Sequence, residues 1–227
     1  MSAVAEPERS NARLGFWLLT VGAVATLGYA ARFTTQSKGS DDRSVLYHWS
    51  TAAGGLFQFG IFLAIVLAIS GGSSRRLALR PPRSWKRALG LASAVFFVSW
   101  IGLGLLDKVF HGGQEQALTP DRWQPKHAAA FAANFLVIAL VAPLVEELLF
   151  RGIGFHLLQR FGEPAAIVAT GLAFGLYHGL VNALPILTLF GIALAWLRWR
   201  TRSVYPGMLV HAAFNAVALV VSVTING

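Results

Sequence analysis

The sequence has no cysteine and few charged residues. Without cysteine there is neither a disulfide nor a thiolate metal site, and the redox compartment stays open. Charged residues make up 13% of the 227 residues, hydrophobic residues 55%, and the mean hydropathy is +0.58. Soluble domains are about 45–50% apolar and about 25% charged. The composition therefore predicts an integral membrane protein.

The few charges are mostly basic, and the net charge is +9. Such an excess can indicate nucleic-acid binding, but cytoplasmic loops of membrane proteins also collect lysine and arginine. We therefore expect no nucleic-acid partner. The abundance of alanine, glycine and arginine favours a bacterial origin.

The sequence also lacks the period-two alternation of a membrane β-barrel, and lipid tolerates only helices or closed barrels. A helix needs about 20 apolar residues to span the bilayer. The prediction is an all-α polytopic membrane helix bundle with about seven transmembrane helices. The run at 184–197 is short, and "VNALP" before it indicates a tight turn. The apolar runs are 15–31, 51–70, 88–106, 128–150, 164–181, 184–197 and 204–225.

The positive charges predict the orientation. With the N-terminus in the cytoplasm, the inner segments hold 13 of the 19 lysines and arginines and the outer segments hold 6. Most of the bias comes from the cluster between Arg75 and Arg87. We expect a multi-pass protein of the inner (plasma) membrane with a cytoplasmic N-terminus. The first run can also be read as a cleaved signal peptide, and residues 32–50 are expected to form a solvated surface loop.

Three charged residues interrupt the fourth apolar run, "VAPLVEELLFRG". Ionisable groups at membrane depth are costly and often functional. Glu147 and Arg151 are spaced i, i+4 with the glutamate first, which favours an ion pair. Glu146 points about 100° away around the helix. It has no local partner and becomes the main functional candidate.

The fourth helix is expected to continue to about Phe161, with a turn at Gly162 and Pro164 in the first turn of the next helix. Glu146 lies 16 residues before Gly162, and His178 lies 16 residues after it. Both therefore lie about 24 Å from the turn, at one level. Phe174 lies one turn before His178. A buried histidine with only a structural hydrogen bond is the alternative interpretation of His178.

The last run contains "HAAFN", in which His211 and Asn215 share one helix face. They can simply join helices. Together with Glu146 and His178, however, they form a set suited to hydrolysis. Glu146, aided by His178, can act as general base toward water, while His211 and Asn215 donate hydrogen bonds to an oxyanion. Glu146, His178 and His211 are also a possible zinc set. No cofactor is certain.

The patterns E-E-x-x-x-R, F-x-x-x-H and H-x-x-x-N, in this order, resemble the CPBP family of intramembrane proteases. That family includes the type II CAAX prenyl endopeptidases and the bacterial Abi proteins. The resemblance covers roughly residues 128–220. The segment "RTRS" departs from the more usual Arg-Thr-Gly-Ser, which affects the local turn. The matching residues are Glu146, Glu147, Arg151, Phe174, His178, His211 and Asn215.

The resemblance implies peptide-bond hydrolysis in a cavity open toward the cytoplasm. It implies that Glu146 and His178 activate water, that His211 and Asn215 form the oxyanion site, and that Glu147 and Arg151 support this geometry. We expect membrane helices and loops in residues 1–127, a protease core in 128–225, and a peptide or membrane-protein substrate within the lipid bilayer.

Motifs of other intramembrane proteases are missing: the sequence has no G-x-S-G, no H-E-x-x-H and no G-x-G-D. Two alternatives from other classes remain. The first is a non-catalytic immunity or scaffold factor, and the second is a small proton-coupled transporter using Glu146 and His178. An intact residue set argues against the first, and the lack of an internal repeat argues against the second.

Overall fold

The computed structural model describes residues 5–35, 44–115 and 123–225, and all regular structure within them is helical. Six long helices and one composite helix follow the seven predicted apolar runs. The composite helix runs from Pro125 to Phe161. The six are α1 (Ala5–Thr35), α2 (Trp49–Ser70), α3 (Trp85–Phe110), α8 (Glu163–Tyr177), α9 (Leu184–Thr201) and α10 (Tyr205–Ile225).

Five of these helices are long and apolar enough to cross a membrane, counting only the described residues. They are α1, α2, α3, the composite helix and α10. The other two, α8 and α9, are shorter and pack against each other. The predicted all-α membrane bundle is therefore confirmed.

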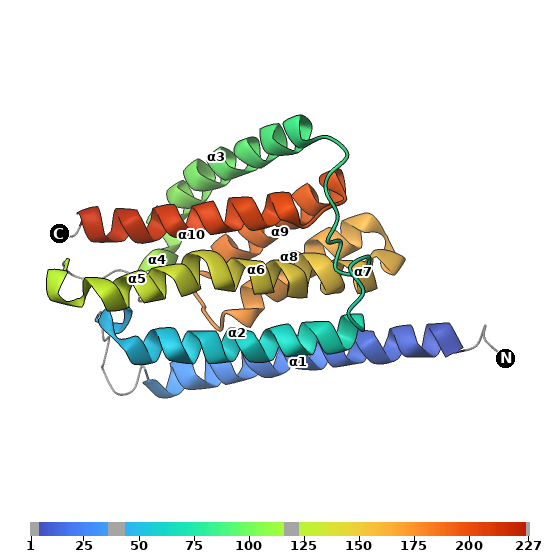
Figure 1. The fold of residues 1–227 in the computed structure, drawn as a ribbon, viewed down its shortest axis with the longest axis horizontal. Coiled ribbons are helices and arrows are strands. Elements are labelled where there is room, and N and C mark those ends of the chain that lie inside the picture. Colours follow the sequence, from blue (N-terminus) through green and yellow to red (C-terminus); the bar gives the residue numbers. More distant parts are fainter. Residues whose placement is uncertain (1–4, 36–43, 116–122, 226–227) are drawn as a thin grey trace.

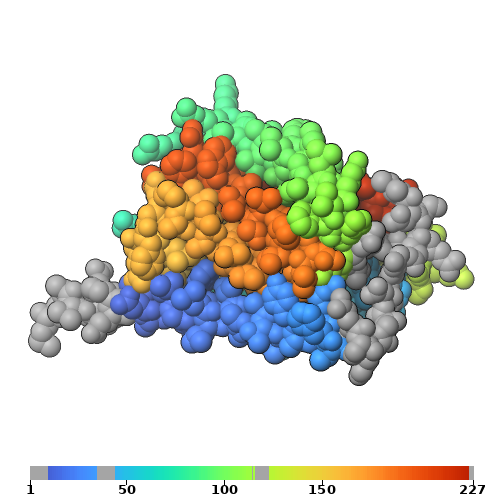
Figure 2. All heavy atoms as spheres, turned by 180° about the vertical axis from the view of Figure 1, so that it is seen from behind, coloured from blue at the N-terminus to red at the C-terminus, as the bar shows by residue number. Residues whose placement is uncertain are grey.

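The composite helix lies near the middle of the molecule (Figure 1). In this view α1 and α2 run along one side of it, α10 lies on the other side, and α3 lies beyond α10. From behind, α8 and α9 cover the middle of the molecule between α1 and α3 (Figure 2). The composite helix is therefore enclosed by neighbours from several directions.

The composite helix is not a regular α-helix. Two π-helical segments, η4 (Val137–Val141) and η5 (Leu148–Gly154), flank the short helix α6 (Ala142–Glu147). Its remaining parts are η3 (Pro125–His127), α5 (Ala128–Leu136), α7 (Phe155–Leu158) and η6 (Gln159–Phe161). The predicted continuity of this helix to Phe161 is confirmed, whereas the π segments were not expected from the sequence.

The turn that joins the composite helix to α8 is the predicted one. Gly162 has φ +103°, which is outside the range of most side-chain-bearing residues, and Pro164 follows in the first turn of α8. The predicted end of α8 at residue 181 is wrong. The helix ends at Tyr177 because His178 leads into Gly179, whose φ is +64°.

The predicted surface loop 32–50 also needs correction where it is described. Helix α1 continues to Thr35, and η2 (Val45–Tyr47) buries Leu46 and Tyr47. The Tyr47 ring packs 5.7 Å from that of Phe131. Asn134 Nδ2 donates a hydrogen bond to the Leu46 carbonyl at 3.0 Å. Residues 36–43 lie outside the described part. The segment is thus partly core, because aromatic packing outweighs its polar composition.

Candidate active site

The carbonyl groups of the π segments accept hydrogen bonds from neighbouring helices. An i→i+5 pattern interrupts the regular ladder and makes backbone groups available to other donors. Asn215 Nδ2 donates to the Ile138 carbonyl at 3.0 Å, and Trp17 Nε1 donates to the Leu149 carbonyl at 2.9 Å. These bonds anchor α10 and α1 to the segments on either side of α6, which carries the two glutamates.

Glu147 and Arg151 form the predicted i, i+4 ion pair, with Arg151 Nη1 2.9 Å from Glu147 Oε1. Both side chains are fully buried. Arg151 Nη2 also donates to the Gly191 carbonyl on α9 at 2.9 Å, and the guanidinium lies 4.5 Å from the centre of the Phe174 ring. The pair thus connects the composite helix to α8 and α9, and the attraction between its two charges offsets much of the cost of burying them.

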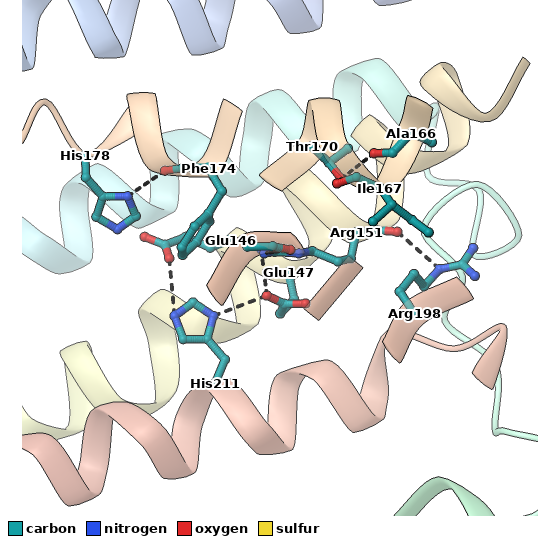
Figure 3. Close-up of polar contacts among 11 residues, drawn as sticks. Glu146, Glu147, Arg151, Ala166, Ile167, Thr170, Phe174, His178, Arg198 and His211 are labelled. Atoms are coloured by element: carbon teal, nitrogen blue, oxygen red, sulfur yellow. Dashed lines mark hydrogen bonds and ion pairs between the residues drawn. The ribbon is translucent and has the colours of Figure 1, made fainter. Parts of the chain in front are cut away.

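His211 on α10 lies between the two glutamates (Figure 3). Its Nδ1 is 3.2 Å from Glu147 Oε1, and its Nε2 is 3.7 Å from Glu146 Oε2. An ionised carboxylate only accepts hydrogen bonds, so Nδ1 carries a proton and donates it toward Glu147. Glu147 therefore holds the ring in an orientation that directs Nε2 toward Glu146.

Aromatic rings fix the position of His211 from two sides. The rings of Phe174 and Phe190 approach it edge-on, with centroid distances of 5.5 Å and 5.4 Å. Edge-to-face packing of this kind is favourable and leaves little rotational freedom. The orientation of the imidazole is therefore set by packing as well as by its hydrogen bond.

His178 follows the last residue of α8 and is half-buried. Its Nδ1 is 2.7 Å from the Phe174 carbonyl. A carbonyl oxygen cannot donate, so the ring nitrogen does, and in the neutral ring this leaves the lone pair of Nε2 available. The bond to the backbone thus determines the tautomer that His178 adopts.

Glu146, His178, His211 and Asn215 line one cavity of about 430 Å³. Figure 3 shows the Glu146 carboxyl group on the side of the two histidines, whereas Glu147 turns toward Arg151. Glu147 and Arg151 do not line the cavity. The structure therefore brings all four candidate catalytic residues together and separates the two adjacent glutamates. Glu146 and His178 line the same cavity, in agreement with their predicted common level.

Most of the cavity wall is apolar, and sequence reasoning missed much of it. Helix α3 supplies Trp100 and Leu103, and α9 supplies Phe190, although neither helix carried a recognised motif. Their positions depend on how α3 and α9 cross α10, and this crossing cannot be recognised from the pattern of apolar residues alone. Asp107, in the last turn of α3, is a further polar residue of the wall.

Glu115 is a second acidic residue that the sequence analysis did not select. It lies in α4 (Gly112–Glu115), and its carboxylate accepts hydrogen bonds from the backbone N–H groups of Val181 and Ala183 at 2.9 Å and 2.8 Å. It also forms an ion pair with Arg32 at 2.7 Å. Glu115 thus secures the turn that follows His178 and connects it to α1.

The geometry of the site also bears on the possible zinc set of Glu146, His178 and His211. In the described ranges, no three histidine, aspartate or glutamate side chains are grouped so that they can hold a metal ion. His211 Nδ1 is directed to Glu147, and its Nε2 is still 3.7 Å from Glu146. The residues as arranged do not fit a zinc site.

The fold and the site define a multi-pass helical membrane protein in which a cluster of buried glutamate and histidine side chains borders a largely apolar cavity. Residues 128–217 match the family model described as type II CAAX prenyl endopeptidase Rce1-like. All seven candidate residues lie in the matched range. The family expected from the three motifs is therefore confirmed for this part of the chain, which points to a peptidase. No curated protein and no solved structure matches the chain.

Proposed function

We propose that the protein is an intramembrane endopeptidase that hydrolyses a peptide bond with water activated by Glu146. The main support is that Glu146, His178, His211 and Asn215 line one cavity while Glu147 and Arg151 neutralise each other behind it. Of the two adjacent glutamates, Glu146 thus remains available to a reactant.

In this proposal a water molecule lies between Glu146 and His178. The carboxylate of Glu146 accepts one proton from it, and the free Nε2 lone pair of His178 accepts a hydrogen bond from the other. The water oxygen attacks the scissile carbonyl carbon and forms a tetrahedral intermediate. The proton held by Glu146 then passes to the leaving amine as the C–N bond breaks. The products are one carboxylic acid and one amine.

The oxyanion receives hydrogen bonds from α10. Asn215 Nδ2 carries two hydrogens, and one of them is directed to the Ile138 carbonyl, so the second can serve the oxyanion. His211 Nε2 donates when the imidazole is doubly protonated. Its positive charge together with that of Arg151 then balances the negative charges of Glu146 and Glu147. Donors fixed in advance by a protein framework stabilise such charge most effectively.

The apolar wall indicates the kind of substrate. Trp100, Leu103 and Phe190 face the cavity from α3 and α9, and burial of apolar side chains is favourable by about 25 cal/mol per Å². We therefore propose a peptide or membrane-protein substrate with apolar residues beside the scissile bond. With the N-terminus cytoplasmic, His211 lies six residues into α10, about 9 Å from its cytoplasmic end. The cavity extends from there toward the opposite end of the helix, as far as Ser222, which does not favour cleavage near the cytoplasmic face.

The test is cleavage of a panel of apolar peptides in proteoliposomes by the wild type and by Glu146→Gln. Glutamine keeps the size of the side chain but cannot take up the proton, so cleavage should fall to background. Glu163→Gln, in an acidic residue outside the cavity, serves as the matched control and should cleave like the wild type. Cleavage by Glu146→Gln at more than about a tenth of the wild-type rate contradicts the mechanism, since general bases contribute about 10²–10⁴-fold.

A further inference from the structure

A second cavity lies far from the catalytic cluster, where α9 ends and α3 begins. It has a volume of about 570 Å³. The segment that leads into α3 passes beside this end of the bundle (Figure 1). The walls of this second cavity come from the segment that leads into α3, from the first turns of α3 and from the end of α9. The lining residues are Arg80, Pro81, Pro82, Arg83, Ser84, Arg87, Ala88, Leu91, Arg200, Thr201 and Arg202.

Five arginines line this second cavity, and their charges are poorly compensated. Among the described residues, Arg202 is the member paired with a carboxylate, at 3.3 Å from Glu163. Arg80 Nε donates to the backbone carbonyl of Arg202 at 2.7 Å, which brings two cationic residues together without neutralising either. Like charges repel at such separations. An anion that binds among them would relieve this repulsion.

The backbone at Arg202 provides an independent observation. Arg202 has φ +59°, in the left-handed region where glycine is preferred. Non-glycine residues in this region are strained, and such strain often marks a functional position. Here a long cationic side chain occupies the strained position and lines the cavity.

The chemistry of the walls fits an amphiphilic ligand better than a soluble ion. The arginines form a polar rim, whereas Ala88 and Leu91, one and two turns into α3, continue the wall along a membrane-spanning helix. Exposed Trp85 begins the same helix, and tryptophan is typical of the membrane interface. The first N–H groups of α3 add a partial positive charge at its start.

We infer that this second cavity binds the phosphate headgroup of an anionic phospholipid, with the arginines on the phosphate and an acyl chain along Ala88 and Leu91. Arginine recognises phosphate oxygens through paired hydrogen bonds. Basic pockets between membrane helices bind anionic headgroups in the same manner. The bound lipid would fix the end of α9 against the start of α3.

The experiment measures lipid retention by native mass spectrometry of the full-length protein, titrated with phosphatidylglycerol in detergent. Arg83→Gln/Arg87→Gln should weaken retention by about tenfold or more. Arg202→Gly should also weaken it without loss of folding, because glycine relieves the positive φ. Arg75→Gln removes an exposed arginine of the same segment that does not line the cavity, and it should bind like the wild type.

Two further arms distinguish the sources of phosphate. Phosphatidylcholine should bind more weakly than phosphatidylglycerol, and millimolar inorganic phosphate should not displace the lipid. Full displacement by inorganic phosphate would assign the cavity to a soluble anion and overturn the lipid proposal. Equal retention by wild type and both cavity variants, or an equal loss in Arg75→Gln, would show that general surface charge holds the lipid and would also overturn it.

Discussion

Removal of the buried guanidinium by Arg151→Met should strongly destabilise the protein. The substitution leaves the Glu147 carboxylate buried without its cation and the Gly191 carbonyl without its donor. Breaking a buried ion pair from one side costs about 3–5 kcal/mol, and each unpaired buried polar group accounts for about 1–3 kcal/mol of such losses. We therefore expect the free energy of unfolding to fall by about 3–5 kcal/mol.

The double variant Glu147→Leu/Arg151→Met separates stability from activity. Replacement of both partners by apolar residues is often neutral, so the double variant should regain at least half of the stability lost in Arg151→Met. The double variant should nevertheless be inactive, because His211 Nδ1 then has no carboxylate to orient it. This combination would make Glu147 a positioning residue for His211 as well as a structural partner of Arg151.

The assay is reversible unfolding in mixed micelles with increasing dodecyl sulfate, followed by the fluorescence of the seven tryptophans. Peptide cleavage is measured on the same preparations. A loss below about 1 kcal/mol for Arg151→Met would refute the argument, since that is the value of an exposed pair. A double variant that is stable and also cleaves at the wild-type rate would show that Glu147 does not orient His211.

Four further outcomes can be measured on the same protein. Trp17→Phe removes the donor to the Leu149 carbonyl, and the free energy of unfolding in the same assay should fall by about 1–3 kcal/mol. Asn215→Ala should reduce kcat by about 10²–10³ with little change in KM, as expected for an oxyanion donor; an unchanged kcat would exclude that role. Metal chelators should leave cleavage unchanged, and a loss restored by zinc would contradict the metal-free proposal. Since the chain lacks cysteine, the single variants Ser74→Cys and Lys126→Cys can each be labelled with a thiol reagent that does not cross the membrane. If the N-terminus is cytoplasmic, only Lys126→Cys should be labelled in intact cells. Labelling of Ser74→Cys alone would show the opposite topology.

Local chemistry in the sequence was sufficient to predict several features of the site. The Glu147–Arg151 pair follows from i, i+4 spacing, and the turn at Gly162 follows from a glycine and a proline at the junction of two apolar runs. The level match of Glu146 and His178 follows from counting equal distances from that turn. These inferences succeed because each depends on helix geometry over one or two elements.

Features that depend on contacts between distant helices were not predictable in this manner. The π segments leave no spacing pattern in an apolar run, so the bonds of Asn215 and Trp17 to their carbonyls were not expected. The ring of Phe190 reaches His211 only because α9 and α10 cross at a particular position. Residues that contact helices distant in the sequence were therefore missed, even where the helices that carry them were predicted.

The different environments of the two adjacent glutamates follow from the helices that surround α6. Glu147 faces Arg151 and His211 in the closed interior, whereas Glu146 faces the cavity. His211 touches both, at 3.2 Å and 3.7 Å, and so connects the structural carboxylate to the proposed catalytic one. A change in the Glu147–Arg151 pair is therefore passed to Glu146 through the His211 imidazole, in addition to the helix backbone that the two glutamates share. This connection explains why we expect a residue outside the cavity wall to control hydrolysis inside it.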